Sequence, residues 1–252
     1  SREAEDLQAE LAAMLGNKVA MFPAWETLPH ERLSPGADIV GKRAAVLHRL
    51  DELDVIVTPA RGLAQPVLES VDGRAPISLA EDQEYDFDQL VAELEFRAYS
   101  HVDMVSKKGQ FAKRGGIVDV YPTTLDYPVR IEFWGDEITD IRQFSVADQR
   151  TISEIEVGKV AIFAARELPI TDAVAAKAEK LAREYASNAT LAELLTKISE
   201  KIPSEGMEAL LPVLTDAPMV SLLDLVPDNT HVLVMDPEKV RRRAVSYTHL
   251  RA

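Results

Sequence analysis

The chain has 252 residues, of which 46% are hydrophobic and 28% charged, a composition that indicates a globular protein with one large or two ordinary domains. Its 42 acidic and 28 basic residues give a net charge of −14, which argues against a general binder of the nucleic-acid backbone. The absence of cysteine excludes disulfides, thiolate zinc sites and cysteine nucleophiles.

The first third of the chain alternates between predicted helices and strands. Apolar residues at helical spacing end at Gly16, a typical helix stop, and Asp38 is expected to cap the next helix. In chain order, the predicted elements are a helix ending at Leu15, a strand over 19–22, a helix over 38–50, a buried parallel strand over 55–57 and a short helix over 62–68. This alternation indicates an α/β layer.

The pattern changes near residues 73–76, where one helix is followed by consecutive strands, as in an α+β unit. Gly135-Asp136 has the composition of a two-residue hairpin turn. The predicted elements here are a helix over 87–99 and strands over 101–105, 116–121, 129–134 and 137–146.

From about residue 157 the chain becomes helical again. Asp172 is expected to cap an alanine-rich helix, and a second helix is predicted over 191–202. The apolar run from His231 to Met235 predicts a late buried strand.

The strand over 129–134 carries the most informative candidate site. Because successive side chains point to opposite faces of a strand, one face holds Val129, Ile131 and Phe133, and the other holds Arg130, Glu132 and Trp134. Tryptophan and arginine are the residue types that anchor protein interfaces. The structural alternative is that Trp134 covers a cross-strand neighbour while Arg130 balances Glu132 or a nearby aspartate.

A local basic window precedes this strand. From Arg97 to Arg114 the sequence has five basic residues and one acidic residue, against the overall charge. Such a window is more often a solvated loop than a recognition patch. It gains interest because it leads directly into the strands that carry Arg130 and Trp134.

Two segments imitate nucleotide-binding motifs. Gly36 to Lys42 has the GxxxxGK spacing of a phosphate loop, but Arg43 stands where Ser or Thr should bind magnesium, and no buried strand precedes the segment. Val232 to Asp236 imitates a strand that ends in a magnesium ligand, which is common in any α/β fold. A working nucleotide site is therefore not expected.

A membrane span, a signal peptide and a metal site are also not expected. No apolar run approaches the roughly 20 residues of a membrane span, and the first residues are charged where a signal peptide would be apolar. The five histidines are widely spaced, without metal-ligand spacing. We therefore expect a cytoplasmic protein with no metal site.

Several segments together resemble a known family. FPAWETLPHERLSP, GQFAKRGGIVDVYP and YPVRIEFWGDEITDIRQFSVADQR, in this order, are similar to the amino-terminal, UvrB-like region of bacterial transcription-repair coupling factors (the Mfd family). The resemblance runs from about residue 2 to about residue 244. It implies a degenerate, helicase-type (RecA-like) α/β domain over 1–75 and 157–244, with a smaller α+β domain inserted over 76–156. Residues 245–252 do not continue the family's pattern and are expected to be a non-native or disordered tail.

The resemblance also implies a function. In this family the inserted domain binds UvrA, and the matching motifs place that role on Arg114, Arg130 and Trp134, the last of which can be Phe in relatives. The chain would then recruit UvrA to lesion-stalled RNA polymerase in transcription-coupled nucleotide excision repair. It would have no ATPase of its own, and its isolated form is expected to be monomeric. Contacts with RNA polymerase and DNA, and the ATP and Mg sites, would lie in other domains of the parent protein.

The sequence leaves two alternatives open. One is a UvrB-type excinuclease subunit, which needs a functional phosphate loop and an aromatic DNA-clamping hairpin that are not visible here. The other is a nucleotide hydrolase that uses Gly36–Lys42 together with Asp236.

Overall fold

The computed structural model describes residues 2–27, 31, 33–69, 75–156 and 158–249, which form two compact units. One unit comprises Ser1–Val71 and Ile170–Ala252, and the other comprises Asp72–Pro169. The expected change of pattern at 73–76 falls partly outside the described residues. The second unit ends later than the expected residue 156, because the strand Lys159–Ile162 pairs with Ile77–Ala80 at its beginning.

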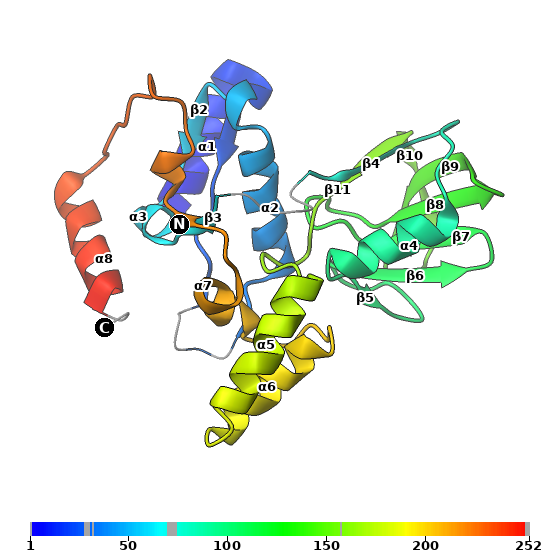
Figure 1. The fold of residues 1–252 in the computed structure, drawn as a ribbon. Helices are drawn as coiled ribbons and strands as arrows, with labels where there is room; N and C mark the ends of the chain where they lie inside the picture. Colours follow the sequence, from blue (N-terminus) through cyan, green and yellow to red (C-terminus); the bar gives the residue numbers. More distant parts are fainter. Residues whose placement is uncertain (1, 28–30, 32, 70–74, 157, 250–252) are drawn as a thin grey trace. The chain divides into compact units, whose positions relative to one another are not determined.

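The first unit is mainly helical and holds two short sheets (Figure 1). β1 and β2 are parallel, and β3 pairs with β12 in the antiparallel sense. Its elements are α1 (Arg2–Leu15), η1 (Gly16–Lys18), β1 (Val19–Met21), α2 (Ala37–His48), η2 (Leu50–Glu52), β2 (Val55–Val57), α3 (Ala60–Ala64), β3 (Val67–Leu68), α5 (Asp172–Glu184), α6 (Ala189–Ser199), η3 (Met207–Leu210), α7 (Leu211–Leu214), β12 (Met219–Val220), η4 (Leu222–Asp224) and α8 (Pro237–His249).

Buried apolar clusters hold this unit together. Phe22, Val46, Val67 and Leu222 form one cluster, so β1, α2, β3 and η4 share a core although they are distant in sequence. A second cluster packs α1 against β1 and β2. The helix ending at Leu15 and the parallel strand over 55–57 are confirmed.

Four predictions for this unit were wrong. The short helix predicted over 62–68 ends at Ala64, and Val67–Leu68 form β3. Asp38 does not cap α2, because the helix begins one residue earlier and its cap is Gly36, which has no side chain to donate or accept. Thr171, not Asp172, caps α5 through a hydrogen bond from the Val174 amide. The segment from His231 to Met235 is exposed and forms no strand in the described structure.

The second unit is built on a six-stranded sheet with the order β10-β9-β8-β7-β6-β5 (Figure 1). From β6 to β9 the strands form an antiparallel meander, and β4 and β11 form a separate ladder. The elements are β4 (Ile77–Ala80), α4 (Phe87–Phe96), β5 (Ser100–His101), β6 (Gln110–Arg114), β7 (Ile117–Val120), β8 (Val129–Trp134), β9 (Glu137–Phe144), β10 (Thr151–Glu156) and β11 (Lys159–Ile162).

One face of this sheet is buried under α4, which lies across it in Figure 1. Asp86 begins the helix by accepting a hydrogen bond from the Gln89 amide at 2.6 Å. Phe87 meets Phe133 edge to face, with 5.3 Å between ring centroids. Val129, Ile131 and Phe133 are all buried, so the predicted alternation of β8 is confirmed.

The chain is therefore a mixed α/β protein, which is the fold class that its sequence pattern indicates. Residues 245–249, expected to belong to a disordered or non-native tail, continue α8, and 250–252 lie outside the described residues. None of the described helices has the length and apolar content needed to span a membrane.

Candidate protein-binding surface

The register of the meander defines a second face of the sheet, which we call the outer face. Directly paired residues of antiparallel strands point to the same side. Asp119 pairs with Arg130, and Arg130 pairs with Arg142. By the same register, the outer face over β6 to β9 carries Arg114, Ile117, Asp119, Arg130, Glu132, Trp134, Glu137, Asp140 and Arg142. The three predicted site residues thus share one face.

Trp134 is the most exposed aromatic side chain on this face, with 81% of its surface accessible. It ends β8, directly before the turn at Gly135, whose φ of +64° favours glycine. The chain before α4 braces this hairpin, because the Tyr85 amide donates to the Asp136 carbonyl at 2.7 Å. A large apolar side chain is therefore held in water on a well-anchored turn.

Arg114 ends β6 at the same end of the sheet as Trp134. Its side chain is exposed, and no ion pair engages it among the residues that the structure describes. The following turn approaches β8 closely, since the Phe133 amide donates to the Gly116 carbonyl at 2.8 Å. A Cβ added at Gly116 would lie 2.8 Å from the Phe133 carbonyl oxygen, so glycine is required there. The basic window is thus partly strand, not only a solvated loop.

Arg130 has a different environment. Its Nε and Nη2 donate to the two carboxylate oxygens of Asp119 at 2.7 and 2.8 Å, and its guanidinium lies 5.0 Å from the centroid of the Phe144 ring. The hydrogen bond to Asp119 raises the pKa of Arg130. The side chain is only 22% exposed. Arg130 is therefore paired with a nearby aspartate, as the structural alternative proposes.

A second ion-pair group lies beside this pair. Arg142 contacts both Glu132 and Asp140. Together with Arg130 and Asp119, two guanidiniums face three carboxylates, so the centre of the outer face has a net charge of −1. The free positive charge on this face is therefore that of Arg114.

Sequence reasoning missed Asp119 and Arg142. The alternation of Ile117 to Val120 is enough to put Asp119 on the outer face. It is not enough for Arg142, because β9 has a register shift between Ile138 and Asp140 that interrupts its alternation. What was lacking was the register that sets each opposite Arg130.

Comparison with known proteins finds relatives of the second unit and of the chain as a whole. Residues 77–168 match the UvrB interaction domain family. The chain is 49% identical, over 96% of its length, to the transcription-repair-coupling factor of Mycobacterium tuberculosis (strain CDC 1551). It is 33% identical to that of Myxococcus xanthus and 28% identical to that of Escherichia coli K12, over 89% of its length in each case.

The chain belongs to the transcription-repair-coupling factor family. The resemblance of the sequence motifs to the UvrB-like region of this family is thereby confirmed. The chain spans about a fifth of the length of these relatives. The matched domain coincides closely with the second unit, Asp72–Pro169, which carries the whole outer face.

Other candidate sites in this family member are weaker. Residues 37–42, the centre of the GxxxxGK segment, form the first turns of α2, so they do not form an open loop. Arg43 is fully buried, with its guanidinium 4.3 Å from the centroid of the Phe22 ring and 5.6 Å from that of Trp25. Among the described residues, no group of three or more histidine or carboxylate side chains could hold a metal ion.

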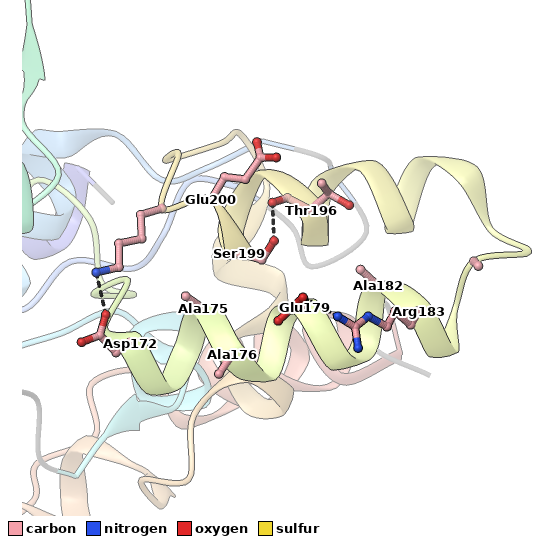
Figure 2. Close-up of a pocket in the computed structure, with 11 residues that line it drawn as sticks. Asp172, Ala175, Ala176, Glu179, Ala182, Arg183, Thr196, Ser199 and Glu200 are labelled. Atoms are coloured by element: carbon pink, nitrogen blue, oxygen red, sulfur yellow. Dashed lines mark hydrogen bonds and ion pairs between the residues drawn. The ribbon is translucent and has the colours of Figure 1, made fainter.

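An open groove runs between α5 and α6 in the first unit (Figure 2). Alanines of α5 line it, and its rim carries the Glu179–Arg183 and Asp172–Lys201 ion pairs. Its hydroxyls are satisfied within α6, since Ser199 donates to the Thr196 carbonyl and Thr196 to that of Ala192. Both hydroxyls of the groove therefore already have hydrogen-bond partners within α6.

Proposed function

We propose that this chain recruits UvrA through the outer face of its second unit. The parent protein would thereby bring UvrA to lesion-stalled RNA polymerase in transcription-coupled nucleotide excision repair. The observation that carries the proposal is an 81%-exposed tryptophan on a braced hairpin, within a match to the UvrB interaction domain.

The physical basis is an aromatic anchor beside a free cation. Trp134 offers apolar area that a recess on the partner can bury, and tryptophan is among the residues most enriched at binding hot spots. Arg114, at the same end of the sheet, can pair with a carboxylate of the partner. The acidic character of the chain as a whole fits a protein partner better than DNA.

We further propose that the first unit is a degenerate helicase-type domain without ATP hydrolysis. The helical conformation of residues 37–42 supports this, because a phosphate loop needs free backbone amides directed at the phosphates. Arg43 has no hydroxyl that could bind magnesium at that position, and its guanidinium is buried against Phe22. The ATP and Mg sites, and the contacts with RNA polymerase and DNA, would then belong to other parts of the parent protein.

Calorimetric titration of purified UvrA with the 252-residue chain tests the recruitment role. We expect saturable binding to UvrA and none to UvrB, which serves as the control for general adhesion to repair proteins. Absence of binding to UvrA would refute the proposal. ATP titration of the same chain tests the second part, which saturable ATP binding would contradict.

A further inference from the structure

We propose that Glu137 determines charge specificity on the outer face, and that the recess on UvrA that receives Trp134 carries a basic side chain on the side next to β9. Because Arg114 lies on the other side of Trp134, the recess would then have one basic and one acidic margin. This inference rests on the proposed function of the outer face. It adds a contact residue and states the charge pattern that the partner must have.

Glu137 is the direct neighbour of Trp134 across the β8–β9 hairpin. The two residues pair in the antiparallel register, so their side chains lie on the same face. The Cβ atoms of such pairs are about 4.5–5.5 Å apart. β6, which ends at Arg114, lies on the opposite side of β8 from β9, with β7 between them. Trp134 therefore stands between a carboxylate on β9 and a guanidinium on β6.

Glu84 extends the acidic side of this row. It forms an isolated antiparallel bridge with Glu137, so these two side chains also lie on one face, and both are exposed. Like charges directly opposite each other are destabilising. The hairpin is braced instead by its backbone, through the hydrogen bond from the Tyr85 amide to the Asp136 carbonyl. Support of the hairpin therefore does not explain why two carboxylates lie side by side here.

The other carboxylates of the outer face are already neutralised. Asp119, Glu132 and Asp140 each contact an arginine of the same face. Among the residues that the structure describes, no ion pair or side-chain hydrogen bond engages Glu84 or Glu137. The fold thus pairs the carboxylates at the centre of the face and leaves those beside the exposed tryptophan available to a partner.

Burial of Trp134 determines what the partner must offer to Glu137. A recess that covers the indole also removes water from the carboxylate beside it, because the two side chains are direct neighbours. A charge that loses water without gaining a counter-charge costs free energy. An arginine or lysine of the partner that faces Glu137 removes this cost and fixes the orientation of the recess on the hairpin.

Charge variants of Glu137 test the sign of the partner's charge. In calorimetric titration of UvrA with the 252-residue chain, Glu137→Gln should raise Kd by about tenfold, which is the scale of one lost charged hydrogen bond. Glu137→Lys should raise it further, because lysine repels the partner's cation. Glu95→Gln is the matched control, since Glu95 is an exposed glutamate of α4, which covers the other face of the sheet. It should leave Kd within about twofold.

Thermal unfolding of the same variants separates a contact from a structural role. Glu137→Gln should keep Tm or raise it by up to about 2 °C, because the change removes repulsion from Glu84. A fall in Tm of more than about 2 °C together with weaker binding would show that Glu137 supports the hairpin, and it would overturn the inference.

The order of the affinities decides the remaining cases. If Glu137→Lys binds most tightly, the recess is acidic on this side and the inference is wrong. It is also wrong if Glu137→Gln binds as tightly as Glu95→Gln. If the unmodified chain does not bind UvrA, the proposed function fails and this inference fails with it. If that chain binds and the variants do not follow the expected order, only the inference fails.

Discussion

Truncation of Trp134 to alanine should greatly weaken UvrA binding without destabilising the chain. A buried tryptophan covers about 150–250 Å². Since 81% of Trp134 is exposed in the free chain, a fitted recess on UvrA could bury up to about 160 Å². At about 25 cal/mol per Å² this amounts to about 4 kcal/mol. Ordering of the side chains at the interface offsets about 0.5–1.5 kcal/mol of it. We therefore expect a loss of about 2.5–3.5 kcal/mol, or about 70- to 380-fold in Kd.

Calorimetric titration against UvrA measures this loss, and thermal unfolding measures the stability of the same variants. The change in unfolding free energy should stay within about 0.5 kcal/mol, because the side chain has few intramolecular contacts to lose. Met104→Ala is the matched control, since Met104 is an exposed apolar residue of the same unit, at 60%. A Trp134→Ala variant that binds as tightly as Met104→Ala would refute the hot-spot reasoning.

Three further predictions concern the same unit. Arg114→Glu should weaken UvrA binding and reduce its salt dependence, whereas Lys107→Glu, in the loop before β6, should change neither much. Gly116→Ala should lower the free energy of unfolding by about 1–3 kcal/mol, because the added Cβ would lie 2.8 Å from a carbonyl oxygen of β8. An unchanged midpoint of urea unfolding would contradict this close approach. Burial raises the pKa of Tyr85 from 10.0 to about 12 and that of Tyr99 further. Both groups therefore keep their protons in the folded state after the unfolded chain has lost them, so stability should fall as pH rises above about 10. In thermal unfolding from pH 8 to 11, Tyr99→Phe should show a shallower fall than the unmodified chain.

Local signals predicted the centre of the second unit well. The hairpin at Gly135-Asp136 and the alternation of Val129 to Trp134 depend on neighbours in sequence, and both are confirmed. The strands β4, β6, β10 and β11 are not among the predicted ones, and the strand predicted over 101–105 is limited to Ser100–His101. β4 and β11 pair although they lie at opposite ends of the unit in sequence. Each short strand is therefore stable only because of the other, and no local sequence pattern indicates that pairing.

The first unit illustrates a different limit. Arg43 was considered only as a mismatch to a magnesium ligand, whereas the fold buries it between the rings of Phe22 and Trp25 and gives it the Pro23 carbonyl as an acceptor. An arginine in a helix is normally expected at the surface. Its burial depends on an irregular segment some 20 residues earlier, whose path cannot be derived from periodicity.

The same contrast between local and non-local features applies to the candidate site. Alternation alone is sufficient to place Trp134 in solvent, because exposure of a strand residue depends on which face is packed. The role of Arg130 cannot be decided in that way, since alternation puts Arg130 and Asp119 on the outer face without stating that they are opposite each other. Register decides between a free guanidinium and a paired one. For this reason loss of UvrA binding in Arg130→Ala would not identify a contact, because the substitution also leaves the Asp119 carboxylate without its cation. Asp119→Asn is more informative than Arg130→Ala, because it removes the charge that pairs with Arg130 and keeps the guanidinium itself.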